Sequence, residues 1–188
     1  MKITKTTLPG VFSITPDIFS DDRGSLIKSF HGPTLKAEGL VSNLEQSLCS
    51  ISKKGVFRGM HFQTPPKEQV KIVYVAQGAI LDVILDLRKG SPTYKQYVTL
   101  ELSADNNVMA YIPAGCAHGF LSLADNTRVI YLQDHIQSPE NEAGVHMNSF
   151  GMKWDISNPI MSKKDSVLPT LAEYESPFIY QDTNENIN

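Results

Sequence analysis

The fold of this chain is decided by the stretch Gly55-Val-Phe-Arg58-Gly-Met-His61-Phe-Gln-Thr-Pro-Pro-Lys-Glu-Gln-Val-Lys71-Ile-Val-Tyr-Val75. Two segments that alternate apolar and polar residues flank a Pro-Pro turn, which predicts two neighbouring strands with one buried face. Arg58, His61 and Lys71 interrupt the apolar residues. Burying such groups without partners costs roughly several kcal/mol each, so they indicate a lined cavity rather than a plain core. The alternative is that all three point outward into water.

The rest of the chain predicts more short strands separated by turns. They lie at residues 11–15, 25–30, 44–52, 78–88, 97–102, 108–112, 119–123 and 127–133, the last two as a hairpin, with one short helix at 33–38. We expect Phe19 to be buried at a turn and the polar tail from about residue 181 to be frayed. Many short strands with regular turns predict an all-β antiparallel sandwich or barrel, formed by residues 1–188 as one domain.

The composition argues against several classes of function. A hydrophobic fraction of 41% and a charged fraction of 20% are ordinary for a soluble globular protein. The net charge of -3, with no basic cluster among aromatics, argues against a nucleic-acid partner. No apolar run suits a signal peptide or a membrane helix. Cys49 and Cys116 show no metal-binding spacing, so we expect reduced thiols and a cytoplasmic protein.

Residues 113–118 carry the Pro-x-Gly-x-x-His pattern of the second cupin motif, which ends at His118. Metal-binding cupins take His-x-His and a Glu from their first motif, and here the corresponding residues are His61, Gln63 and Glu68. A Gln amide is a poor ligand for Zn, Fe or Mn, so we predict no metal and no cofactor. A metal site formed by His61, Glu68 and His118 is the alternative.

Without a metal, a histidine in this position is free to act as a base near neutral pH. Lys71 would place a cation beside a developing oxyanion, and Tyr131 would serve as an acid on a facing strand. Asp165 would hold a histidine in one tautomer. Each candidate has an ordinary explanation, because a Tyr on an apolar strand is usually core and a Lys-Asp pair near a terminus is usually surface.

Taken in order, motifs across residues 10–170 resemble the dTDP-4-dehydrorhamnose 3,5-epimerase family, the metal-free cupins of nucleotide-sugar metabolism. They are Phe19-x-Asp-x-Arg23-Gly, Gly55-Val-Phe-Arg58-Gly-Met-His61-Phe-Gln, Gln69-Val-Lys71-Ile-Val, Asp86-Leu-Arg-x-Gly-Ser-Pro-Thr-Tyr, Ile112-Pro-x-Gly-x-Ala-His118-Gly-Phe, Tyr131 and Ser162-Lys-Lys-Asp165. The resemblance implies a cupin-type antiparallel jelly-roll barrel with a few short peripheral helices. It also implies an epimerase that acts on a nucleotide-linked 4-keto-6-deoxy sugar in deoxysugar or O-antigen biosynthesis.

The resemblance also implies a role for each site residue. His61 would remove a proton beside the keto group, with Asp165 as its dyad partner. Lys71 would stabilise the enolate oxygen, and Tyr131 would return a proton from the opposite face. The implied substrate-binding residues are Arg23, Lys28, Gln46, Arg58, His118 and Glu142.

Three departures from the family pattern fall at the end of the site that should hold the base. Lys28 replaces a Glu, Gln46-Ser-Leu48 replaces Gln-Asp-Asn, and Ile136-Gln137 replaces an aromatic pair, whereas Glu142 is retained. The nucleotide, the sugar and the number of inverted centres therefore stay open. A CDP-linked 3,6-dideoxy-4-hexulose 5-epimerase, another single-centre epimerase, a non-catalytic sugar-nucleotide-binding cupin and a metal-dependent cupin are the alternatives. The resemblance implies a homodimer in which residues 19–30 reach the neighbour's site.

Overall fold

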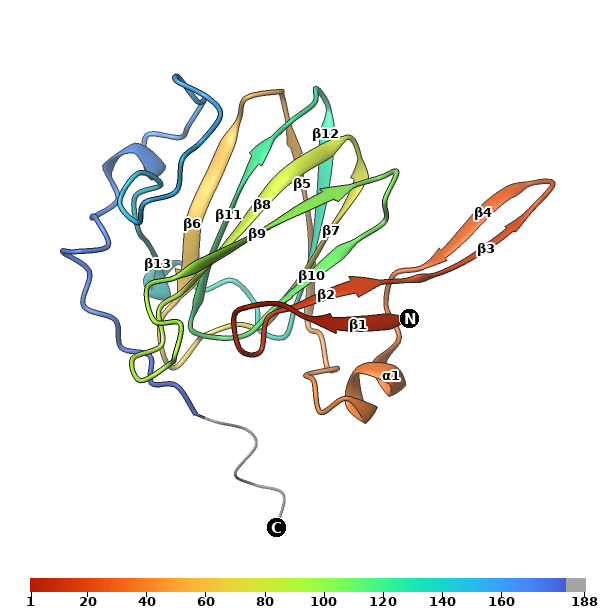
Figure 1. The fold of residues 1–188 in the computed structure, drawn as a ribbon, viewed down its shortest axis with the longest axis horizontal. Helices are drawn as coiled ribbons and strands as arrows, with labels where there is room; N and C mark the ends of the chain where they lie inside the picture. The colour runs from red at the N-terminus through yellow and green to blue at the C-terminus, as the bar shows by residue number, and fades with distance from the viewer. Residues whose placement is uncertain (182–188) are drawn as a thin grey trace, which may run out of the picture.

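The chain folds into two antiparallel β-sheets that face one another, as seen in a computed structural model that describes residues 1–181 (Figure 1). The six-stranded sheet has the order β1-β2-β10-β7-β12-β5. Its strands are Lys2–Lys5, Phe12–Thr15, Met109–Ile112, Lys71–Gln77, Thr127–Gln133 and Gln46–Ser52, in that order. The five-stranded sheet has the order β13-β6-β11-β8-β9. Its strands are Glu142–Gly144, Phe57–Gln63, Cys116–Ser122, Ala79–Asp86 and Tyr97–Ser103.

The main core lies between the two sheets because each strand turns alternate apolar residues inward. Val73 of β7 and Val129 of β12 meet Ile84 of β8 and Phe120 of β11 there, and all four are fully or almost fully buried. The alternation predicted for residues 97–102 is confirmed, since Val98, Leu100 and Leu102 pack against this core. This two-sheet arrangement confirms the predicted jelly-roll fold.

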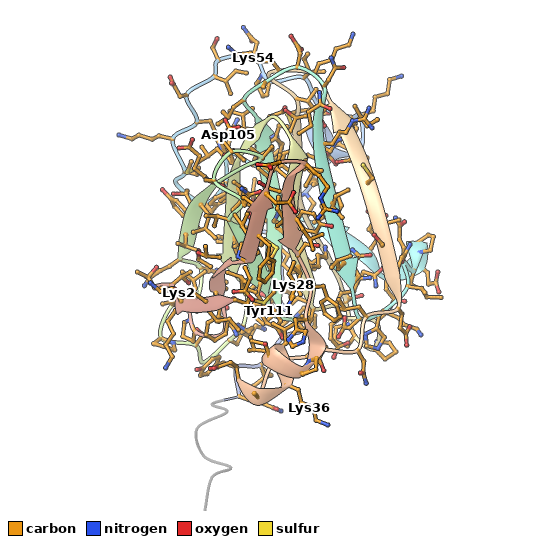
Figure 2. The ribbon with its side chains drawn as sticks, turned by 90° about the vertical axis from the view of Figure 1, so that its right-hand side faces the viewer. Lys2, Lys28, Lys36, Lys54, Asp105 and Tyr111 are labelled. Carbon is orange, nitrogen blue, oxygen red and sulfur yellow. The ribbon has the colours of Figure 1, made fainter. Side chains whose placement is uncertain are left out.

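Two further clusters cover the outer faces of the sheets. The C-terminal part of the chain lies over the five-stranded sheet, where Phe178 and Val145 pack with Phe57 and Phe62. On the six-stranded sheet, Leu35 of helix α1 (Gly32–Ala37) packs with residues of β7 and β10. The backbone N–H of Val41, beyond this helix, donates to the Tyr111 hydroxyl at 3.0 Å, and Figure 2 shows Tyr111 above the helix that carries Lys36. Two short 3₁₀ turns, η1 (Pro139–Asn141) and η2 (Asp165–Val167), complete the predicted peripheral helices.

The motif at residues 86–94 has a structural role at the end of strand β8. The Asp86 carboxylate is fully buried and accepts hydrogen bonds from Arg88 Nε at 2.8 Å and Ser91 Oγ at 2.5 Å. Arg88 also donates to the carbonyl of Pro9 at 2.8 Å. The motif therefore ties the N-terminal loop to the barrel and does not line the cavity described below.

Strands β3 (Asp17–Asp21) and β4 (Gly24–Lys28) form a separate two-stranded ribbon that projects from the barrel (Figure 1). Its apolar side chains lie largely in solvent, with Phe19 53% exposed and Leu26 70% exposed. The prediction that Phe19 is buried is therefore wrong. The ribbon bends away from the two sheets, and the Phe19 ring is contacted within it by Lys28, whose Nζ lies 5.5 Å from the ring centroid.

The predicted hairpin at residues 119–133 and the predicted neighbouring strands around the Pro-Pro turn are both wrong, because the chain crosses between sheets at each turn. Strands β6 and β7, on either side of the Pro-Pro turn, belong to different sheets, and so do β11 and β12. The residues predicted to lie on neighbouring strands therefore face each other across the barrel. The predicted frayed tail falls largely on residues 182–188, which lie outside the described part of the chain. Cys49 is exposed, Cys116 is buried, and both are free thiols.

Candidate functional site

A cavity of about 540 Å³ lies between the two sheets and is lined by most of the predicted site residues. Strand β6 contributes Arg58 and His61, and β11 contributes His118. The facing sheet contributes Lys71 from β7 and Tyr131 from β12. Because the residues come from two sheets, polar groups oppose each other across a space large enough for a ligand.

His61 and Asp165 form a hydrogen-bonded pair at one wall of the cavity. His61 Nε2 lies 2.7 Å from Asp165 Oδ1, and the backbone N–H of Gly59 donates to Oδ2 at 3.4 Å. The Asp165 side chain is 5% exposed, whereas the imidazole is 28% exposed. Burial raises the pKa of the Asp165 carboxyl, but its hydrogen bonds to His61 and Gly59 outweigh burial and leave that pKa below its usual value.

Gly59 allows His61 to reach its place in the wall. Its φ is +131°, and a Cβ at this position would lie 2.4 Å from the Cα of Gly119 on β11. A side chain there would push β6 and β11 apart. The Arg-Gly-Met-His sequence therefore fits the close approach of the two strands whose His61 and His118 are register partners.

His118 forms a second carboxylate pair, with Asp82 of strand β8. The distance from His118 Nε2 to Asp82 Oδ1 is 2.6 Å, and the side chains are 5% and 0% exposed. Asp82 Oδ2 is also buried and has no hydrogen-bond partner in the described chain. The His118 ring meets the Tyr131 ring edge-on with centroids 6.2 Å apart, so this pair reaches toward the facing sheet.

Lys71 lies on the opposite wall, where its side chain is half-buried. Burial lowers the pKa of Lys71 to about 8, although the Glu142 carboxylate draws it partly back up. Glu142 Oε2 also lies 2.7 Å from Lys164 Nζ, in an ion pair beside the cavity. Lys71 is thus a cation that loses its proton far more readily than an exposed lysine.

Tyr131 lies on the same wall as Lys71. It is two residues from Gln133, which is the cross-strand partner of Lys71. Its hydroxyl lies 3.2 Å from Ser50 Oγ on strand β5. Burial raises the pKa of the Tyr131 phenol strongly, while the hydrogen bond to Ser50 acts in the opposite direction. The phenol therefore keeps its proton at neutral pH, as a proton donor must.

The structure places the predicted substrate-binding residues in three places: the cavity lining, its edge and the projecting ribbon. Arg58 lines the cavity, donating from Nε to Ser52 Oγ at 3.1 Å, and Glu142 and His118 line it too. Gln46 lies at the edge of the site, where its Oε1 accepts from the Gln137 backbone at 2.7 Å. Arg23 and Lys28 lie on the projecting ribbon and not in the cavity of their own chain. Arg23 pairs instead with Asp21 at 2.6 Å.

Gln63 and Glu68 occupy the positions that supply metal ligands in other cupins, and neither is arranged as a ligand here. Gln63 Nε2 donates to the carbonyl of Lys67 at 2.6 Å, and Gln63 Oε1 accepts from the Ser138 N–H at 2.6 Å. Glu68 does not line the cavity. Within residues 1–181, no group of three or more His, Cys, Asp or Glu side chains is arranged to hold a metal ion. Those residues also include no helix long and apolar enough to cross a membrane.

Sequence reasoning missed Asp82, Ser50 and Lys164. Asp82 had a signal, because it is a carboxylate inside the apolar run Ala79-Ile-Leu-Asp82-Val-Ile, on the face that alternation turns inward. Ser50 had none, since a Ser on a half-buried strand is common. Lys164 adjoins Asp165 in the Ser162-Lys-Lys-Asp165 motif, but its pairing with Glu142 depends on how the C-terminal segment returns to the barrel.

The chain matches known proteins along most of its length. The family model described as dTDP-4-dehydrorhamnose 3,5-epimerase matches residues 5–173. A relative of that name from Salmonella typhimurium is 37% identical over 177 residues, which cover 92% of this chain and 97% of the relative. The range matched by the family model therefore spans the positions of all the cavity residues named above.

Solved structures show the same similarity. A dTDP-4-dehydrorhamnose 3,5-epimerase from Bacillus anthracis, with TDP and pyrophosphate bound, has a TM-score of 0.88 and 40% identity over 90% of this chain and 99% of its own. A Legionella pneumophila epimerase in complex with dTDP-4-keto-L-rhamnose has a TM-score of 0.91 and 32% identity over 96% and 99%. A 3'-monoepimerase from Streptomyces bikiniensis, in complex with dTDP-quinovose, has a TM-score of 0.85 and 33% identity over 90% and 87%.

Proposed function

Since the chain belongs to the dTDP-4-dehydrorhamnose 3,5-epimerase family, we propose that it is a cofactor-independent epimerase of a nucleotide-linked 4-keto-6-deoxy sugar. The reaction removes a proton from C3, C5 or both, next to the ketone, and returns one from the opposite face. The product serves deoxysugar biosynthesis. We also propose that residues 1–188 form one cupin domain, and that the enzyme works in the cytoplasm.

One observation carries this proposal: a base and an acid stand on opposite walls of one cavity. His61 belongs to the five-stranded sheet and Tyr131 to the six-stranded sheet. A 4-keto sugar held between them loses a proton toward one wall, and the planar enolate that results gains a proton from the other. Inversion of a carbon centre needs this two-sided arrangement, which a single base cannot supply.

His61 is the general base in this proposal. The Nε2–H of its neutral form donates to the Asp165 carboxylate, which leaves the lone pair on Nδ1 to take the substrate proton. Nδ1 has no hydrogen-bond partner among residues 1–181. As the imidazolium forms, Asp165 stabilises its charge, as triad aspartates do.

Lys71 and His118 stabilise the enolate oxygen in the same scheme. A proton next to a ketone is only weakly acidic, so the negative charge that develops on oxygen needs a fixed partner. Preorganised charge in a water-poor site is usually the largest contribution to such catalysis, on the order of several kcal/mol per donor. Lys71 supplies a cation, and His118, held by Asp82, supplies a neighbouring polar group.

Arg58 and Glu142 bind the substrate in the cavity, with Gln46 at its edge. Arg23 and Lys28 lie too far out on the ribbon to join them within one chain. We propose that they act in a homodimer, in which the ribbon of each protomer reaches the partner's site. The exposed apolar residues of the ribbon, including Phe19 and Leu26, support this arrangement because association would cover them.

Proton NMR in D2O tests the function. The enzyme is incubated with 4-keto-6-deoxyglucose carried on dTDP, CDP, GDP or UDP, and deuterium is followed at C3 and C5. We expect exchange with one carrier, and the labelled position shows how many centres are inverted. Absence of exchange with all four would favour a non-catalytic binding protein.

The matched variant for this experiment is His61→Ala. It should lower exchange by about 10²–10⁴-fold, the usual contribution of a general base. Addition of a chelator should change nothing, and full exchange by His61→Ala would exclude His61 as the base. A sedimentation mass of 20.8 kDa for the protein would contradict the homodimer.

A further inference from the structure

The wall formed by the six-stranded sheet carries two rows of side chains with different chemistry. Strand register places Leu48 opposite Tyr131, and Tyr131 opposite Val73, so these three form one row across β5, β12 and β7. Two residues along, Gln46, Gln133 and Lys71 form the next row. Directly paired residues of an antiparallel sheet share a face, about 5 Å apart at Cβ, so each row acts as a unit.

The second row offers polar groups to a ligand. Lys71 is its cation, and Gln133 Oε1 is a buried acceptor without a partner among the described residues. The direction of the Gln133 amide is fixed by a chain of hydrogen bonds. Gln69 Nε2 donates to the carbonyl of His135 at 2.9 Å, so Gln69 Oε1 must accept from Gln133 Nε2 at 3.3 Å. The nitrogen of Gln133 is therefore used by Gln69, and its oxygen is left without a partner among the described residues, in the row that Gln133 shares with Lys71.

The first row is apolar apart from the Tyr131 hydroxyl. Leu48 lines the cavity and is 36% exposed, so it presents an apolar side chain on the row that contains Tyr131. Any sugar hydroxyl placed against it would lose its water and gain no partner, at a cost that binding must absorb. An apolar part of a ligand therefore fits against Leu48 better than a hydroxyl group does.

A 4-keto-6-deoxy sugar has one polar edge and one apolar edge. Its ketone oxygen at C4 and the hydroxyl at C3 form an oxygenated edge, while C5 carries the C6 methyl group. With the ketone at Lys71, the C3 side fits the polar row, and C5 with its methyl fits the row of Leu48 and Tyr131. The opposite orientation would set the C3 hydroxyl against Leu48.

We infer that Leu48 is a specificity-determining residue that packs against the C6 methyl group and selects 6-deoxy sugars. The inference rests on the proposed function, because it takes the ketone to lie at Lys71. In the sequence, Leu48 belongs to the Gln46-Ser-Leu48 segment that departs from the family pattern, and the sequence alone gives it no role toward the sugar. It also places C5 next to Tyr131.

The test compares two substrates that differ only at C6: 4-keto-6-deoxyglucose and 4-ketoglucose, on the nucleotide that supports exchange. For the wild type, we expect kcat/KM to be about 10- to 100-fold higher for the 6-deoxy sugar, as one group in an apolar contact allows. Leu48→Asn, which can hydrogen-bond the added hydroxyl, should bring the two values within about threefold of each other. Leu48→Ala should reduce the preference without reversing it.

Ile51→Asn is the matched control. Ile51 lies on the same strand and is 52% exposed, but it faces away from the cavity, so this variant should keep the wild-type preference. A third substrate, the 3-deoxy analogue, checks the orientation. Turnover of it about tenfold faster than the 3-hydroxy sugar would place Leu48 against C3 and overturn the inference.

Two other outcomes would also overturn it. One is a wild type that treats the two C6 substrates alike, and the other is a Leu48→Asn variant that keeps the full preference while folded by circular dichroism. Failure of the proposed function looks different, because the wild type would then exchange deuterium into none of the sugars.

Discussion

The two walls of the cavity hold their ionisable groups in opposite electrostatic settings. On the wall of β6, β8 and β11, both histidines contact a buried carboxylate, at 2.7 Å for His61 and 2.6 Å for His118. On the wall of β5, β7 and β12, the described residues that line the cavity include no carboxylate. Burial there favours the neutral form of each group, raising the pKa of Tyr131 and lowering that of Lys71.

Because of this difference, the two proton transfers of the reaction take place at different sheets. Carboxylate partners stabilise the imidazolium form, so the first wall suits proton removal. A phenol with a raised pKa stays protonated, so the second wall suits proton return. The cavity therefore has one wall for each proton transfer. The base and the acid lie on different sheets because β6 and β11 belong to one sheet, whereas β7 and β12 belong to the other.

The largest effect that would separate the walls is expected for Tyr131→Phe. Removing the acid while keeping the base should lower formation of the inverted product by about 10²–10⁴-fold. Exchange of the substrate proton with solvent should continue within about tenfold, because His61 can return deuterium to the face from which it took the proton. Proton NMR in D2O separates the two readouts.

Tyr74→Phe provides the control for this measurement. Tyr74 lies on β7 but packs in the cluster on the outer face of the sheet, so both readouts should stay unchanged. If Tyr131→Phe reduced exchange and inversion equally, the acid would have to be another group, and the division between the walls would be wrong.

A smaller effect should distinguish the two histidines of the first wall. His118→Ala leaves the fully buried Asp82 carboxylate without its hydrogen-bond partner, which should lower the free energy of unfolding by about 3–5 kcal/mol. His61→Ala should cost about 1–2 kcal/mol, because that ring is part-exposed and Asp165 keeps the Gly59 N–H. Urea unfolding of both variants measures the difference.

The double variant Asp82→Leu with His118→Leu checks the cause. It removes the whole buried pair, so it should recover most of the stability that His118→Ala loses. Equal losses for His118→Ala and His61→Ala would mean that burial does not distinguish the two pairs.

Much of the fold was predictable because strand formation depends on local patterns. The alternation at residues 97–102 and the turn residues between segments are read directly from the sequence, and the structure confirms them as strands. Pairing was not predictable in the same way. The turns after β6 and after β11 have residues that suit hairpins, yet both carry the chain to the other sheet, and that choice depends on distant contacts.

The site shows the same limit. His61, Lys71 and Tyr131 interrupt apolar strands, so their presence in a cavity could be expected from the sequence. Asp165 lies 104 positions from His61, and only the return of the C-terminal segment over the barrel buries it. Arg23 belongs to a family motif, as His61 and Lys71 do, but it lies in the β3–β4 ribbon that projects from the barrel. The sequence does not show that this ribbon projects.

The smallest effect concerns the charge of Lys71 on the second wall. Enolate stabilisation needs the ammonium form, so activity should fall as the pH rises through about 8, the pKa to which burial lowers this group. The same shift affects stability. Because the folded-state pKa is below the unfolded value of about 10.4, the folded protein binds fewer protons between these values, and its stability rises with pH across that window.

Lys71→Met should therefore be inactive and yet more stable than the wild type at pH 7, by about 2 kcal/mol in the free energy of unfolding. Its advantage should shrink above pH 8 and vanish roughly one unit above the unfolded-state pKa of about 10.4, where the wild-type lysine is neutral in both states. The exposed Lys53 gives the control, since Lys53→Met should change neither activity nor stability. A wild-type rate that stays constant to pH 9, or equal stability of Lys71→Met at pH 7, would show that the second wall does not favour neutral groups, and the contrast between the walls would fail.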